Sequence, residues 1–249
     1  MTRLPVGVVW SVFARSFAIQ GSWNYRTLQG SGFAFALMPV LRWVHGQDNE
    51  RLQEAVTRHT TLFNAHPYLA GVVLGAVARM EADGEDPSVI ERFKMALRGS
   101  LGALGDRMIW AGWRPACVLL GLVVLLVTQS AVAAVALFLI VYNSGHLTLR
   151  WWGLRIGLEH GRSVSEALRT APLLRWHTAI VSVAALLLGM ALPLVVAGGM
   201  TRSVLPAIWM IGPAAGALAG WRLGAAVRLP TLILLVVVAI TGFLVRLNE

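Results

Sequence analysis

Residues 118–142 read VLLGLVVLLVTQSAVAAVALFLIVY, a stretch without a charged side chain. A transmembrane helix needs about 20 consecutive, mainly apolar residues, so this stretch is long enough to span a bilayer. Further apolar stretches follow at 179–196, 204–219 and 232–247. About four hydrophobic spans are therefore predicted in the C-terminal half, the second of them kinked or ended by Pro193.

The composition of the whole chain also indicates an integral membrane protein. Hydrophobic residues make up 57% of it, only 13% are charged, and the mean hydropathy is +0.67, whereas soluble domains carry about 25% charged residues. The net charge is +9, but the basic residues form no stripe of the kind that binds nucleic acid. Anionic lipid headgroups are the expected partner of this charge. Cys117 is the only cysteine, which excludes an internal disulfide and a thiolate metal cluster.

The chain is predicted to divide near residue 115, into an amphipathic or re-entrant region (1–115) and a transmembrane helical region (116–249). The first helix is expected to continue through Gln20 and Asn24, where both amides lie on its apolar stripe. The acidic segment 81–87 is predicted to be an exposed turn, with Ser88 capping the helix that follows. Residues 143–175 are interpreted as a basic linker after a span that ends near Asn143.

Three polar motifs interrupt the amphipathic region, and each contains glycine or proline or borders on it. The first motif, Gln20-Gly21-Ser22-Trp23-Asn24-Tyr25, places an amide between aromatic rings. Such rings can stack on the faces of a sugar, and an aromatic belt at the membrane interface is the alternative. The amides of Gln20, Asn24 and Gln29 are candidate substrate-binding groups.

The second motif, Phe63-Asn64-Ala65-His66-Pro67, contains two further candidates. Pro67 disfavours the helical conformation at the preceding residue, so Asn64 and His66 are predicted to project from a helix break. An amide and a neutral imidazole can each donate a hydrogen bond to a sugar hydroxyl and accept one from it. The alternative is that Asn64 caps a helix whose first turn contains Pro67.

The third motif, at residues 99–106, has glycines at intervals of three, namely Gly99, Gly102 and Gly105. On a helix these glycines form a smooth strip that another backbone can approach closely. Asp106 follows directly, and a carboxylate in or near the membrane is a candidate functional group. The alternative is a packing strip whose carboxylate pairs with a neighbouring arginine. No nucleophile, paired carboxylates or metal-ligand spacing accompanies these motifs, so a catalytic or metal site is not predicted.

On these three motifs and Tyr142-Asn143, the chain resembles the IID subunit of the mannose/fructose/sorbose-type sugar phosphotransferase permeases. The resemblance implies an all-α polytopic protein of the bacterial cytoplasmic (inner) membrane, with broken or re-entrant helices in its N-terminal half. It implies a IIC membrane subunit as hetero-oligomeric partner and a hexose-type sugar as substrate. It also implies cytoplasmic IIA and IIB proteins that carry the phosphate, so the chain itself needs no cofactor and no phosphohistidine.

The chain departs from that family pattern at two positions. Arg26-Thr27 stands where the family has Glu-Arg, and Ser100 stands where the glycine-rich motif has proline. A guanidinium offers only hydrogen-bond donors, so a site that used a carboxylate at position 26 would lose an acceptor. A non-transporting membrane scaffold or regulatory sensor linked to the phosphotransferase system is therefore the alternative function.

Overall fold

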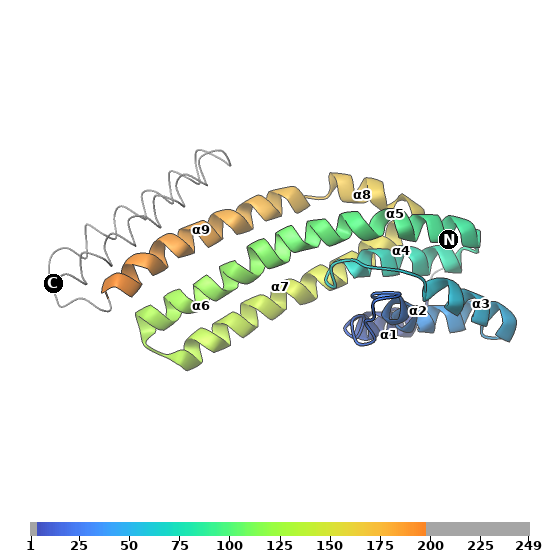
Figure 1. Ribbon diagram of the computed structural model, residues 1–249, viewed down its shortest axis with the longest axis horizontal. Helices are drawn as coiled ribbons and strands as arrows, with labels where there is room; N and C mark the ends of the chain where they lie inside the picture. The colour runs from blue at the N-terminus through green and yellow to red at the C-terminus, as the bar shows by residue number, and fades with distance from the viewer. Residues whose placement is uncertain (1–3, 198–249) are drawn as a thin grey trace. The chain divides into compact units, whose positions relative to one another are not determined.

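The computed structural model describes residues 4–197, and this part of the chain is almost entirely helical (Figure 1). Within it, β-structure is limited to two isolated bridges, Asn24 to Leu28 and Leu28 to Phe63. The helices, in chain order, are α1 (Val6–Ser16), α2 (Gly30–His45), α3 (Asn49–His59), α4 (Ala70–Ala82), α5 (Pro87–Gly105), a π-helix (Asp106–Trp113), α6 (Arg114–Thr128), α7 (Ala131–His160), a 3-10 turn (Gly161–Ser163), α8 (Val164–Thr170) and α9 (Leu173–Ala197).

The predicted all-α membrane fold is confirmed. Three helical segments are long and apolar enough to cross a bilayer, at Pro87–Thr128, Ala131–Thr170 and Arg175–Leu192. Between 11% and 33% of the most apolar window of each segment is buried inside the protein. Apolar surface exposed along a helix of this length is stable in lipid rather than in water.

The boundaries of the spans differ from the prediction in two places. Residues 118–142 are not one span, because α6 ends at Thr128 and α7 begins at Ala131. Gln129 adopts the left-handed conformation (φ 55°) and reverses the chain between them. This turn contains neither glycine nor proline, the residues that usually mark a turn, so it was not predicted. The apolar stretches 204–219 and 232–247 lie outside the described residues.

The predicted linker at 143–175 is also wrong, because α7 continues without interruption from Ala131 to His160. Asn143 therefore lies within a helix, where its Nδ2 donates to the carbonyl of Leu139. α9 likewise continues past Pro193 to Ala197, so the helix does not end at that proline.

The described residues form two compact units, one of residues 4–107 and 144–173, the other of residues 108–143 and 174–197. The predicted division at residue 115 follows hydropathy, whereas these units follow packing. Because α7 passes from the second unit into the first, its C-terminal half packs with helices from the beginning of the chain. Each unit is described separately below.

In the first unit α4 is the central helix. Its residues from Ala70 to Ala78 are all buried, which is the expected pattern for a helix that is apolar on every side. α1, α2 and α5 pack around it, and the fully buried rings of Phe33 and Phe63 lie beside it with centroids 4.5 Å apart.

α4 and α7 approach so closely that their backbones touch. A Cβ atom on Gly75 would lie 2.2 Å from the carbonyl oxygen of Leu154, and one on Gly157 would lie 2.3 Å from that of Val72. Gly71 and Gly153 make similar close contacts one turn away. Two pairs of glycines spaced by four residues therefore form this crossing, the arrangement that lets membrane helices pack at short range.

Several local predictions for the first unit are corrected. α1 ends at Ser16 rather than near Asn24, and residues 17–22 form consecutive turns. α2 then begins at Gly30, and its Gly32 lies so close to the preceding turns that a Cβ there would clash with the backbone of Ile19. α5 begins at Pro87 and is capped by Asp86, not by Ser88, because the fixed φ of proline suits the first helical position.

In the second unit α6 and α9 pack along one another (Figure 1). Val123, Leu187 and Ala191 are buried at their contact, with Leu119, Leu120, Leu122 and Leu194 partly buried around it. Exposed apolar residues cover the outside of the unit, among them Val127, Val132 and Ile140. This surface is what a lipid-facing helical hairpin requires.

Candidate functional site

The segment that carries Asn64 and His66 lies between α3 and α4 and is held in place by Gln29. Gln29 is 2% exposed; its Nε2 donates to the carbonyl of Ala65 (2.8 Å), and its Oε1 accepts from the N–H of Ala65 (3.2 Å). The N–H of Gln29 also donates to the carbonyl of Phe63. The amide at position 29 therefore connects the first polar motif to the second, in the way a strand residue pairs with its neighbour.

Asn24 organises the turn that precedes Gln29. Its Oδ1 accepts from the N–H groups of Arg26 and Thr27 at 3.0 and 2.9 Å, and its Nδ2 donates to the Thr27 hydroxyl at 2.9 Å. An asparagine that accepts from the backbone two and three residues ahead is a common turn-forming device. The carbonyl of Thr27 in turn accepts from the N–H of Phe63, so the turn also contacts the second motif.

His66 lies directly against the glycine strip of α5. A Cβ on Gly105 would be 2.1 Å from the Cβ of His66, and one on Gly102 would be 4.0 Å from the Cα of Ala65. Nothing lies within 4 Å of a Cβ on Gly99. The close contact at Gly105 is with the His66 side chain rather than with the backbone that the strip predicted; only glycine leaves room for the imidazole, and the second and third motifs meet there.

The His66 ring is 2% exposed, and this burial is the main reason that its pKa falls to about 4. The Asp106 carboxylate opposes the shift and the Arg150 guanidinium adds to it. His66 is therefore neutral at physiological pH. Because its Nδ1 accepts from the N–H of Tyr68 (3.2 Å), the neutral ring carries its proton on Nε2.

The other predicted residues lie at the surface. Asn64 and Asp106 are exposed, whereas Ala65 and His66 are buried, so five predicted positions are grouped here: Asn64, His66, Gly102, Gly105 and Asp106. We call this group, together with Gln29, the His66 site. Gln20 is exposed in the turns after α1 and has no contact with the site among the interactions of the described residues. The alternative role of Asn64 as a helix cap is excluded, because α4 begins at Ala70 after Leu69.

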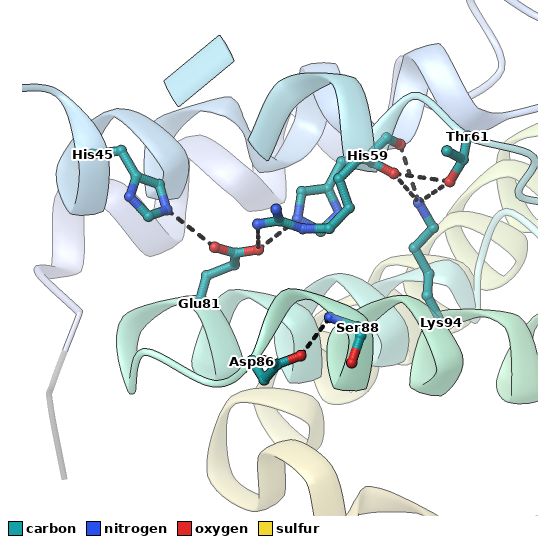
Figure 2. Close-up of polar contacts among 8 residues, drawn as sticks. His45, His59, Thr61, Glu81, Asp86, Ser88 and Lys94 are labelled. Atoms are coloured by element: carbon teal, nitrogen blue, oxygen red, sulfur yellow. Dashed lines mark hydrogen bonds and ion pairs between the residues drawn. The ribbon is translucent and has the colours of Figure 1, made fainter. Parts of the chain in front are cut away.

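A second polar group in the same unit was not predicted from the sequence. Glu81, assigned to an exposed turn, is 4% exposed at the end of α4. Figure 2 shows His45 of α2 and His59 of α3 directed at its carboxylate. Its Oε1 accepts from Arg58 at 2.7 Å and His59 at 2.8 Å, and its Oε2 lies 3.1 Å from His45. We call these residues, with Lys94 and Thr61, the Glu81 cluster.

Hydrogen bonds and ion pairs stabilise the buried charged groups of the Glu81 cluster. Burial alone would raise the pKa of Glu81, but the hydrogen bonds and charges of His59 and Arg58 lower it to about 2. Burial lowers the pKa of His59, so this imidazole is neutral and donates through Nε2. Lys94 of α5 reaches the end of α3, where its Nζ donates to the carbonyls of Arg58 and His59 and to the Thr61 hydroxyl (Figure 2).

The two groups have different chemical capacities. The Glu81 cluster joins the ends of α2, α3 and α4 to α5; its carboxylate is paired with Arg58, and Lys94 donates to carbonyl and hydroxyl oxygens. The His66 site combines a neutral imidazole with an exposed amide and an exposed carboxylate, which is a set of donors and acceptors suited to hydroxyl groups. Across residues 4–197 no cluster of three metal-ligating side chains occurs.

Comparison with known proteins gives consistent matches. The family described as "PTS system mannose/fructose/sorbose family IID component" matches residues 4–208. The mannose-specific EIID component of the phosphotransferase system (PTS) of Escherichia coli K12 is 33% identical over 164 residues, 64% of this chain and 57% of the relative. The fructose permease IID component of Bacillus subtilis 168 is 30% identical over 171 residues, 67% of this chain and 61% of the relative. The matched regions thus span roughly three fifths of each relative.

Two solved structures share the fold. A structure titled only as a membrane protein has a TM-score of 0.68 at 27% identity and covers 76% of this chain and 71% of its own. The cryoEM structure of the mannose transporter ManYZ in complex with microcin E492 has a TM-score of 0.61 at 22% identity, covering 98% and 97%. The similarity in fold to this second structure therefore extends over 98% of this chain.

Proposed function

Because the chain belongs to the mannose/fructose/sorbose family of PTS IID components, we propose that it forms the translocation path for a sugar of that class together with a IIC membrane subunit. Transport uses phosphoenolpyruvate as the source of phosphate. Cytoplasmic IIA and IIB partners perform the phosphoryl transfer, and this chain contributes binding groups rather than catalytic ones. The complex is a hetero-oligomer in the bacterial inner membrane, crossing it several times.

The observation that carries the proposal is the meeting of two polar motifs at Gly105. The His66 ring fills the space that glycine leaves on α5, with Asn64 and Asp106 exposed beside it. Neutral hydroxyl-bearing ligands are recognised by groups that can donate and accept without carrying a full charge. The neutral imidazole and the amide meet that requirement, and the carboxylate adds acceptor oxygens for hydroxyl donors.

The candidate residues divide into two roles. Asn64, His66 and Asp106 are proposed to bind sugar hydroxyls. Asn24 and Gln29 use their amides on backbone groups, so we propose that they shape the binding segment around the sugar. Gln20 lies in the turn region and is proposed to contribute only where the partner subunit closes over that surface.

Substituting the two central residues tests the proposal. Asn64→Ala and His66→Ala are expected to lower sugar affinity roughly 2- to 10-fold each, because losing a hydrogen bond to a neutral ligand costs about 0.5–1.5 kcal/mol. Uptake of labelled mannose and fructose is measured in membranes that contain the partner subunits, beside the amount of assembled complex. Assembly is expected to stay unchanged.

Matched controls are available for both substitutions. Asn143→Ala removes an exposed amide whose Nδ2 bonds only within its own helix, and His160→Ala removes an exposed imidazole at the end of α7. Both controls are expected to transport normally. Loss of assembly in proportion to uptake in the Asn64 and His66 variants would assign these residues to folding instead.

Arg26 supports the second candidate function, a non-transporting scaffold or sensor subunit. Its side chain is exposed, and its N–H donates to Asn24 Oδ1 within the turn. If the missing carboxylate has altered a sugar site, Arg26→Glu restores an acceptor and is expected to raise mannose binding or uptake. Unchanged binding beside strong wild-type transport would identify Arg26 as a surface anchor. Absence of transport in both forms would favour the scaffold.

A further inference from the structure

Arg150 is a buried cation on α7 that none of the sequence motifs singled out. Its side chain belongs to the first unit and is 6% exposed. Its Nη1 donates to the carbonyl of Ser16 at 3.0 Å, and Ser16 is the last residue of α1. The C-terminal end of a helix carries partial negative charge, so this contact compensates part of the cost of burying the guanidinium.

The guanidinium of Arg150 also lies over two aromatic rings. The Arg150 Cζ lies 4.8 Å from the ring centroid of Phe17 and 5.0 Å from that of Tyr68. Cations at these distances from a ring face are attracted by its quadrupole, and the flat guanidinium can stack where an ammonium cannot. Arg150 therefore connects α1, α7 and the segment after His66.

Tyr68 transmits this contact to the His66 site. Its ring meets the His66 ring edge to face, with centroids 5.0 Å apart at 82°, and its N–H donates to His66 Nδ1. His146, one helical turn before Arg150, stacks on Tyr68 at 4.8 Å and 22°. Two residues of α7 thus hold the aromatic ring against which the imidazole rests.

We propose that Arg150 is a positioning residue for sugar binding, which fixes the orientation of His66 through Tyr68. The inference rests on the proposed function of the His66 site. Arg150 touches no sugar in this scheme; it determines where the imidazole lies and adds to the effect of burial, which favours the neutral ring. The charged and titratable groups around His66 are Asp106 from the π-helix, Tyr68 from the connecting segment, and Arg150 and His146 from α7. The charge of Arg150 favours the neutral ring and that of Asp106 opposes it.

The test is equilibrium binding of mannose and fructose to the purified full-length chain in complex with its IIC subunit. Arg150→Gln is expected to weaken binding by about the same factor as His66→Ala, and the double variant to bind no more weakly than either single variant. Arg150→Lys keeps the positive charge, but an ammonium cannot stack on the rings of Phe17 and Tyr68. The affinity for sugar is therefore expected to fall, while the pH dependence of binding stays unchanged. Arg150→Gln moves the acid-side loss of binding to higher pH.

Arg155→Gln is the matched control. It lies on the same helix in an exposed pair with Glu159, with side chains 60% and 56% exposed, and is expected to change neither affinity nor pH dependence. Additive effects of Arg150→Gln and His66→Ala would overturn the proposal, as would unchanged affinity in Arg150→Gln. If that variant does not assemble, Tyr68→Leu removes the intervening ring with Arg150 intact, and its effect must likewise vanish in the His66→Ala background.

Failure of the proposed function can be told apart from failure of this inference. If His66→Ala leaves sugar binding unchanged, the sugar-binding role is lost, and with it the role of Arg150 in binding. The structural link is then read from the pKa of His66, measured by NMR on ¹³C-histidine in the complex. Arg150→Gln must raise that pKa and Arg155→Gln must leave it unchanged; equal values in both variants would show that Arg150 does not act on His66.

Discussion

Glu81→Gln is expected to destabilise the protein by about 3–5 kcal/mol, because removing one partner of a buried ion pair leaves the other charge uncompensated. Arg58 is held by Glu81 Oε1 at 2.7 Å, and the carboxylate also accepts from His59 and contacts His45. A neutral amide supplies one acceptor but not the charge that the guanidinium requires. Thermal unfolding in mild detergent, followed by tryptophan fluorescence, measures the loss.

The same substitution should change the acid sensitivity of the fold. The pKa of Glu81 is lowered to about 2, so its stabilising contribution is present above about pH 5 and is lost as the pH falls toward 2. Burial also lowers the pKa values of His59 and His66, so the unfolded chain takes up their protons first and stability declines below about pH 7. The stability of the Glu81→Gln variant should therefore still decline between pH 7 and pH 5. Below pH 5 its stability should decline less steeply than that of the original protein.

Glu159→Gln is the control for this experiment. Its partner Arg155 lies 3.3 Å away on the same helix, and both side chains are more than half exposed. Exposed pairs contribute about 0–1 kcal/mol, so little change is expected. Equal effects of Glu81→Gln and Glu159→Gln would show that the Glu81 cluster is open to solvent.

Replacing Gly75 or Gly157 with alanine is expected to separate α4 from α7. The added methyl group would meet backbone atoms at 2.2 and 2.3 Å, and a backbone cannot move aside as a flexible side chain can. Overpacking costs about 1–3 kcal/mol per site, and valine at either position should prevent the first unit from forming. Size-exclusion profiles and unfolding temperatures of the detergent-solubilised variants measure the effect.

Gly99→Ala is the matched control on α5. Nothing lies within 4 Å of a Cβ at this position, so the methyl group meets no neighbour. Alanine is favoured over glycine in a helix by about 1 kcal/mol, and this variant should be as stable as the original or slightly more so. A loss of stability equal to that of Gly75→Ala would refute the packing role assigned to the crossing.

Hydropathy was sufficient to predict a helical membrane protein, because backbone groups in lipid must be satisfied within each segment. It could not place the reversal at Gln129, since a left-handed residue without glycine or proline leaves no mark in the sequence. It also placed Glu81 in an exposed turn. Only the tertiary structure brings His45, Arg58 and His59 to that carboxylate from helices 22 to 36 residues away.

The motif reasoning brought part of the His66 site together. The proline at position 67 indicated the break that separates α3 from α4, whereas the neighbour that fits against Gly105 is the His66 side chain and not the predicted backbone. The sequence could not show that the amides of Asn24 and Gln29 form hydrogen bonds with backbone groups. An asparagine or glutamine that stabilises a turn looks the same in a sequence as one that binds a ligand. Arg150 was missed because its partners, Ser16, Phe17 and Tyr68, are far from it in sequence.

The glycine crossing between α4 and α7 also constrains the order in which the protein can fold during synthesis. Gly71 and Gly75 leave the ribosome about 80 residues before Gly153 and Gly157. At roughly 5–20 residues per second, α4 then waits several seconds for the helix that it must touch. Residues 108–143 are made in that interval and belong to the other unit. The N-terminal helices therefore cannot complete their packing as soon as they are translated. The first unit stays incomplete while the hairpin of α6 and α7 enters the membrane.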